Sequence, residues 1–134
     1  MLDGVVCDSI FVLPGQSVEV MGFIPPNCNH FSISLGNDFR NLLLHFDPRF
    51  DPSGINNHII CNSMKDSLWG EVHREHQFPF QKGTCTTITF TYHENRITVK
   101  MPSECSFDFP VRYFMRAIRF LSMKNLQLAC LTLE

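Results

Sequence analysis

Residues 42–50 alternate between apolar side chains and side chains that form hydrogen bonds, and they are the first candidates for chemistry in this chain. In an extended chain successive side chains project to opposite sides, so the two kinds separate. The apolar side, which we expect to face a core, consists of Leu42, Leu44 and Phe46. The polar side consists of His45, Asp47 and Arg49. This pattern predicts a strand that presents a polar face to a ligand.

Three residues further along complete a set that suits a neutral sugar. Asn62 offers an amide, Trp69 is the only tryptophan, and Arg74 adds a second guanidinium group. Sugar hydroxyls pair with guanidinium and amide donors, and the apolar C–H face of a sugar packs on an indole ring. These groups favour binding over bond breaking.

The same residues also fit a simpler interpretation. A polar row of this kind is often a solvated strand face with an internal salt bridge. Pro48 counts against a central strand, because proline removes a ladder hydrogen bond, and it favours a sheet edge or a bend. A lone tryptophan is more often a core residue, but Asp66-Ser67 before Trp69 and Gly70 after it predict a turn and an exposed ring.

Neither a catalytic residue nor a metal site is expected. Cys61 with His45 or His58 would be the candidate nucleophile and base, but a cysteine in an apolar run is usually an inert core residue. The cluster at 73–76 contains two histidines and Glu75. In a strand the two histidines would point to opposite faces, and their spacing matches no zinc pattern. No cofactor is expected either.

Length and composition predict one globular domain over residues 1–134, long enough to bury a sizeable core. Hydrophobic residues make up 44% and charged residues 18%, which excludes a disordered chain. The net charge of −2 and the pI near 6.3 do not favour binding to nucleic acid or to an anionic membrane. Thirteen phenylalanines predict a core filled largely by phenylalanine.

The opening residues, Met1–Val6, lack the basic start and the long apolar run of a secretory signal. No stretch reaches the length of a membrane span, so no membrane insertion is expected. The six cysteines form no C-x-x-C pair, and the chain contains no Asn-x-Ser/Thr sequon. Synthesis in the cytosol and free thiols are therefore the expectation.

Short β-branched and aromatic runs separated by Gly, Pro and Asn predict an all-β sandwich. The expected strands include residues 5–6, 17–23, 31–35, 42–49, 59–61, 87–92, 97–101 and 126–133. Residues 111–121 remain ambiguous, because their apolar spacing also suits one face of a short helix with Pro110 in its first turn.

The two ends of the chain are candidates for assembly. The last run, residues 126–133, has apolar side chains on both faces. Terminal strands of this kind at a sheet edge can pair across a two-fold axis and cover each other. An ordinary edge strand of a monomer explains the pattern nearly as well.

The combined motifs resemble the galectin family, in particular its single-domain, prototype members, over essentially the whole chain. The motifs that carry the resemblance are His45-Phe46-Asp47-Pro48-Arg49-Phe50, Ile60-Cys61-Asn62-Ser63, Trp69-Gly70 with Arg74-Glu75, Phe78-Pro79-Phe80, Phe-x-Ile-x-Leu-Gly at 31–36 and Phe-x-Phe-Pro-x-Arg at 107–112.

The resemblance implies a concanavalin-like jelly-roll of two antiparallel sheets without a cofactor. It also implies a groove for β-galactoside-containing glycans and glycoproteins. By position, His45 and Arg49 would hold the axial 4-hydroxyl of galactose, Asn62 and Arg74 would reach other oxygens, and Trp69 would stack on the apolar face. The resemblance further implies a homodimer through the N- and C-terminal strands, and a cytoplasmic and extracellular protein exported by a non-classical route.

Two residues depart from the family pattern. Asp47 replaces an asparagine, and an ionised Asp accepts hydrogen bonds but donates none. Val72 replaces a glutamate, and Glu71 is one position early, so in a strand it would face the other way. Arg49 and Arg74 therefore lose a shared counter-charge.

We hypothesise that Asp47 partly replaces the lost carboxylate as the partner of Arg49 or Arg74. The main prediction is then a lectin with weakened or altered galactoside specificity. The alternative is a galectin-fold structural or protein-interaction module, or a binder of another sugar, that has lost galactoside binding. A cysteine-dependent enzyme is a third alternative, disfavoured because no oriented pair of base and nucleophile is readable.

Overall fold

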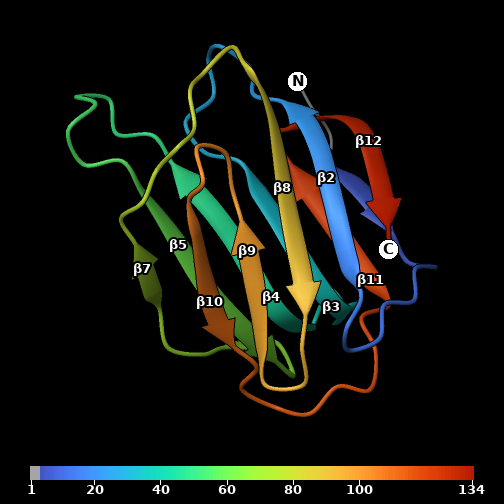
Figure 1. Cartoon of the computed structure of the whole chain (residues 1–134). Coiled ribbons are helices and arrows are strands. Elements are labelled where there is room, and N and C mark those ends of the chain that lie inside the picture. Colours follow the sequence, from blue (N-terminus) through green and yellow to red (C-terminus); the bar gives the residue numbers. More distant parts are fainter. Residues whose placement is uncertain (1–3) are drawn as a thin grey trace.

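The computed structural model describes residues 4–134, and within them the chain forms two antiparallel sheets packed face to face. Figure 1 shows these two layers, with β2, β8, β9 and β10 in front of β3, β4 and β5. The predicted jelly-roll sandwich of two antiparallel sheets is confirmed. The opening residues 1–3, part of the stretch searched for a signal, lie outside the described residues.

Seven strands form the first sheet, in the order β1-β11-β3-β4-β5-β6, with β7 also pairing with β5. Their bounds are β1 Val5–Cys7, β3 Ser32–Asp38, β4 Asn41–Arg49, β5 His58–Lys65, β6 Leu68–Trp69, β7 His73–Glu75 and β11 Phe120–Lys124. The second sheet has the order β10-β9-β8-β2-β12. Its strands are β2 Ser17–Phe23, β8 Cys85–Tyr92, β9 Arg96–Lys100, β10 Ser106–Pro110 and β12 Gln127–Leu133.

Phenylalanine rings fill much of the space between the sheets, as the composition predicts. Phe46 of β4 meets Phe90 of β8 edge to face, with the ring centroids 5.5 Å apart. Phe31 meets Phe80 in the same way at 5.3 Å. Aliphatic side chains from both inner faces complete the core. Edge-to-face pairs of this kind stabilise a core beyond their buried area.

The ambiguous segment 111–121 contains no helix. Pro110 is the last residue of β10, the segment after it is irregular, and β11 begins at Phe120. The alternation of exposed and half-buried side chains over 112–116 places every second residue inside, which a helix would not do. Within residues 4–134 no helix is of a length and polarity to cross a membrane.

Two expectations for β4 are wrong. Leu42 does not face the core, because the β4–β5 ladder has a bulge between Leu42 and His45 that moves Leu42 onto the polar face. Pro48 is not at an edge, since β4 lies between β3 and β5. The Pro48 carbonyl accepts a hydrogen bond from the Phe31 amide. The carbonyl and the nitrogen of one strand residue point to the same side, so the Pro48 ring nitrogen also points toward the segment before β3. The regular β3–β4 ladder has ended at this point.

Candidate functional site

The outer face of the seven-stranded sheet, the face turned away from the second sheet, carries the polar row that the sequence predicts. Ser34 of β3 lies opposite His45 of β4, and His45 lies opposite Asn62 of β5. Their neighbours in sequence, such as Ile33, Phe46 and Cys61, are buried in the core. Strand alternation therefore places these polar groups side by side on one surface.

His45 is held in a fixed orientation by its neighbour on β3. Its Nδ1 is 2.7 Å from the Ser34 hydroxyl oxygen. Burial lowers the pKa of His45 from its ordinary value of 6.5; Asp47 opposes the shift, and the charges of Arg49, Lys124 and His30 add to it. A neutral imidazole with one nitrogen engaged leaves Nε2 for a ligand. Among residues 4–134, Nε2 has no hydrogen-bond partner.

This lowered pKa predicts a loss of stability in mild acid. Between the folded pKa and 6.5 the unfolded chain binds a proton at His45 that the folded chain does not. The free energy of unfolding should therefore fall as the pH drops through this window. In His45→Gln, urea unfolding at pH 7.5 and 5.5 should show a smaller fall than in the parent chain. Equal falls in the two proteins would contradict the assignment.

Asp47 is buried on this face, and its carboxylate contacts the side chains of Arg49 and His30. One carboxylate oxygen is 3.0 Å from Arg49 Nη2 and accepts from Arg49 Nε at 3.1 Å. The other oxygen is 2.9 Å from His30 Nδ1. The sequence analysis names Arg49 or Arg74 as the partner of Asp47, and the structure pairs Asp47 with Arg49. Asp47 thus orients Arg49, and its oxygens are largely engaged before any ligand arrives.

His30 is a member of this network that the sequence analysis missed. It lies just before β3 and forms an isolated bridge with Arg49. A signal was present, because His30, Ser32 and Ser34 alternate with the apolar residues of 31–35 and so share the face of His45. Its exposed imidazole extends the polar row from β4 across to the segment before β3.

Asn62 supports the turn that carries the tryptophan. Its Nδ2 donates to the Gly70 carbonyl at 3.1 Å. Its Oδ1 accepts from the Ser63 amide at 2.7 Å and from Arg112 Nη1 at 3.1 Å. The amide oxygen is thus satisfied within the protein, and one N–H of Nδ2 remains for a ligand.

Arg112 is a second residue that the sequence analysis missed as part of the site. Its Nη1 also donates to the Ser63 hydroxyl at 3.1 Å, and its guanidinium lies 4.8 Å from the centroid of the Phe109 ring. A Cβ on Gly70 would come within 2.9 Å of both Arg112 Nη1 and Ser63 Oγ, so a side chain there would displace the Arg112 guanidinium or the Ser63 hydroxyl.

Trp69 is exposed, as the turn signal predicts. Asp66 and Ser67, both with positive φ, form the two-residue connection between β5 and β6. Trp69 then lies in β6 itself, with 52% of its surface exposed. Its ring centroid is 5.1 Å from that of His45, at an angle of 57°. A flat apolar ring beside a hydrogen-bonding imidazole matches the two faces of a pyranose.

Arg74 belongs to the edge strand β7, opposite Ile60 and two strands from Asp47. Its side chain lines a separate hollow with residues 55–58 and His76. Among residues 4–134, no carboxylate forms an ion pair with Arg74, and Val72 is exposed beside it. The six predicted residues thus extend along β4–β7 and do not surround one pocket.

The structure offers no support for the thiol alternative. Cys61 is fully buried in the core, and burial strongly raises the pKa of its thiol. All six cysteines are free, as expected, and Cys85 and Cys130 are exposed. Within residues 4–134 no cluster of three His, Cys, Asp or Glu side chains is arranged to hold a metal ion.

Comparison with known proteins agrees with this geometry. A family model described as "Galactoside-binding lectin" matches residues 8–132. A galectin-1 from Rhinella arenarum is 42% identical over 131 residues, covering 98% of each chain.

Two solved structures are similar over nearly the whole length. One is a toad ovary galectin in complex with thio-digalactose, with a TM-score of 0.95, 41% identity and coverage of 100% of both chains. The other is CG-16, a homodimeric agglutinin from chicken liver, with a TM-score of 0.91, 36% identity and coverage of 98% of this chain and 100% of that one.

Proposed function

The chain belongs to the galactoside-binding lectin family, and from this premise we propose that it binds β-galactosides through His45, Asp47, Arg49, Asn62, Trp69 and Arg74. We propose residues 1–134 as a single carbohydrate-recognition domain. The observation that carries the proposal is the exposed Trp69 ring beside His45, whose Nε2 is open to a ligand. The family is non-enzymatic, in agreement with the expectation that the chain is not an enzyme.

Each residue would make a different contact with the sugar, according to the hydrogen-bonding groups that it has free. His45 Nε2 and the guanidinium of Arg49 would hold the axial 4-hydroxyl of galactose, and Trp69 would pack against its C–H face. Asn62 has one N–H to donate, since its other groups support the Gly70 turn. Arg74 would reach a second sugar unit from β7.

Altered specificity is part of the proposal. Asp47 is engaged by Arg49 and His30 and cannot donate a hydrogen bond to a sugar, as an asparagine would. Within the described chain Arg74 forms no ion pair with a carboxylate, and Val72 occupies the family's glutamate position. Each lost charged hydrogen bond costs about 1.5–3 kcal/mol, so we expect weak binding to a single galactoside.

A lactose titration followed by Trp69 fluorescence tests the function directly. Because Trp69 is the only tryptophan and half its surface is exposed on the proposed site, a bound sugar should change its emission. We expect a saturable change with lactose and none with mannose or sucrose. A flat lactose trace from folded protein would reject the galactoside proposal.

That outcome would favour the second candidate, a galectin-fold interaction module or a lectin for another sugar. The engagement of Asp47 by Arg49 and His30 is the observation that favours it. Screening the folded protein on a broad set of glycans would then separate another sugar from no sugar.

The bivalent form we propose pairs the terminal strands of two copies. β1 and β12 are edge strands of the two sheets, and β12 lies with the C-terminal end on the right side of the sandwich in Figure 1. Val6 and Leu133 on these strands are 48% and 45% exposed. Pairing would cover the open edges, and two weak sites would cross-link glycoconjugates through avidity. We further propose a cytoplasmic protein that leaves the cell by a non-classical route.

The double variant Val6→Asp/Leu133→Asp should be a monomer, because two charges would be buried at the paired edges. Sedimentation should show half the parent mass, and agglutination of galactoside-bearing beads should be lost while lactose still binds. Phe114→Asp, at an 88% exposed position in the connection between β10 and β11, is the matched control and should remain dimeric. A parent chain that sediments as a monomer would contradict the dimer.

A further inference from the structure

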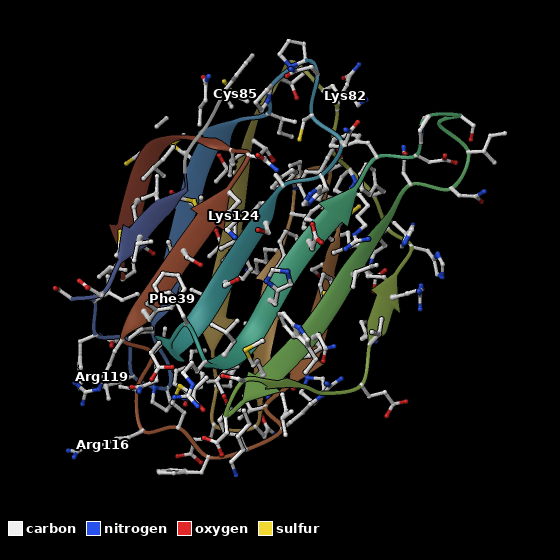
Figure 2. The ribbon with its side chains drawn as sticks, turned by 180° about the vertical axis from the view of Figure 1, so that it is seen from behind. Phe39, Lys82, Cys85, Arg116, Arg119 and Lys124 are labelled. Atoms are coloured by element: carbon white, nitrogen blue, oxygen red, sulfur yellow. The ribbon has the colours of Figure 1, made fainter. Side chains whose placement is uncertain are left out.

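Two titratable side chains of the edge strand β7 face inward and take no part in the proposed contacts with the sugar. His73 and Glu75 alternate with the exposed Arg74. The residue opposite His73 on β5 is Cys61, which is buried in the core. Because opposite residues in a sheet share a face, His73 and Glu75 project toward the second sheet and Arg74 toward the outer face. Figure 2 shows β7 as the outermost strand at the right, beside β5.

His73 packs against the edge of the second sheet. Its ring lies at 23° to that of Phe107 of β10, with the centroids 6.1 Å apart, and it meets Phe109 edge to face at 6.2 Å. The ring is partly exposed, but its Nε2 atom is buried and has no hydrogen-bond partner within residues 4–134. A buried polar atom without a partner is costly, so a bond to Nε2 would be stabilising.

Glu75 places a carboxylate oxygen near this nitrogen and connects β7 to the second sheet. Its Oε1 is 4.0 Å from His73 Nε2, which is beyond the length of a hydrogen bond. Its Oε2 accepts from the backbone amide of Gln77 at 3.0 Å and from the Gln77 side chain at 3.2 Å. The same side chain donates to the Ser106 carbonyl of β10 at 2.9 Å. A bond from His73 to Oε1 would extend this connection along β7.

Glu75 is the acid that faces His73, and the neighbouring elements present other charges away from it. On β5 the opposite group is the Cys61 thiol; burial raises its pKa, and the charge of Glu75 adds to the shift. On β10 Asp108 projects to the other face, because the residues on either side of it pack inward. The Arg112 guanidinium lies over the second of those rings and is engaged by two side chains of β5. A proton on His73 would therefore be balanced by Glu75.

We propose that His73, when protonated in mild acid, forms a charged hydrogen bond with Glu75, and that this bond positions Arg74 for the second sugar unit. An imidazole ordinarily gains its second proton between about pH 7.5 and 5.5. Nε2 then carries an N–H toward Oε1, and a charged hydrogen bond closes to about 2.7–2.9 Å.

The bond acts on Arg74 through the backbone of β7. Arg74 forms no ion pair within the described chain, and its strand pairs with a neighbour on one side. Fixing His73 and Glu75 on either side of Arg74 orders this backbone before the sugar arrives, which lowers the cost of binding. This inference rests on the proposed galactoside binding and adds a positioning residue and a pH dependence to it.

The test compares the affinities for lactose and for methyl β-galactoside by calorimetry at pH 7.5 and 5.5. Methyl β-galactoside lacks the second sugar unit, so protonation of a histidine at the galactose, such as His45, affects both ligands and cancels in the ratio. We expect the ratio of lactose to methyl β-galactoside affinity to be roughly two- to threefold higher at pH 5.5, within the range of a partly exposed ion pair. An unchanged or lower ratio at pH 5.5 overturns the inference.

His73→Gln and Glu75→Gln each remove the charged bond but keep a hydrogen-bonding amide, so the ratio should then be equal at the two pH values. His93→Gln, in the turn between β8 and β9, is the matched control and should keep the rise of the parent chain. A rise that persists in His73→Gln overturns this inference alone. Failure of both sugars to bind the parent chain overturns the proposed function with it.

Urea unfolding of the two variants and of the double variant tests the bond without a sugar. The coupling between His73 and Glu75 should be present at pH 5.5 and absent at pH 7.5, because a neutral imidazole forms no ion pair. No coupling at pH 5.5 rejects the bond, whatever the sugars do.

Discussion

Replacing Trp69 by alanine should lower the affinity for lactose by at least about thirtyfold, on the order of 2 kcal/mol. The ring is a large, half-exposed apolar surface beside His45 that a pyranose can cover, and alanine removes it together with its stacking geometry. The effect should appear in the affinity and not in stability, because half of the ring surface is already exposed.

Calorimetry is the appropriate measurement, since the variant has no tryptophan left to report binding. Trp69→Phe is the matched control, because it retains an aromatic face and should lose much less affinity. Urea unfolding should give similar midpoints for the parent chain and both variants. An alanine variant that binds lactose as tightly as the parent chain would remove Trp69 from the site.

Replacing Val72 by glutamate should increase the affinity for lactose about tenfold. Val72 is exposed and lies immediately before β7, two residues from Arg74, so we expect a carboxylate there to reach the guanidinium. It would orient Arg74 by a charged hydrogen bond and offer an acceptor to the second sugar unit. Arg74 has no such partner within residues 4–134 of the present chain.

Glu71 provides the control for this experiment. We expect the Glu71 side chain to face away from Arg74. Glu71→Gln should therefore leave the lactose affinity unchanged, both in the parent chain and in the Val72→Glu variant. The Val72→Glu gain should also decrease in Arg74→Gln, because the new carboxylate would lose its partner. No gain, or a weaker affinity, would show that the missing glutamate does not limit binding in this chain.

Asp47 differs from the other polar residues of the site because it is not free to bind a ligand. It is nearly fully buried and accepts from Arg49 and His30, so it acts as a positioning residue for the arginine. The hypothesis that Asp47 substitutes for the lost carboxylate holds for Arg49 alone. Arg74, on β7 beyond the intervening strand β5, forms no ion pair with Asp47 within residues 4–134, so the two departures do not compensate each other.

The strands were the most predictable part of the chain. Ser17–Phe23, Cys85–Tyr92 and Arg96–Lys100 follow an alternation that reads directly as one buried and one exposed face. Ser106–Pro110 and Phe120–Lys124 were not assigned as strands. Their short runs gain regular structure from the neighbours β9 and β3, and local periodicity carries little information about such pairing.

Sequence alone determined the family, the sandwich of two antiparallel sheets and the face shared by His45, Asp47 and Arg49, because alternation along one strand is a local property. Only the tertiary structure decided which side chains meet across strands. It paired Asp47 with His30 and Arg49, placed Arg112 behind Asn62, and packed His73 of β7 against Phe107 of β10. These contacts join residues up to 50 positions apart, and the order and register of the strands, which no local pattern encodes, place them together.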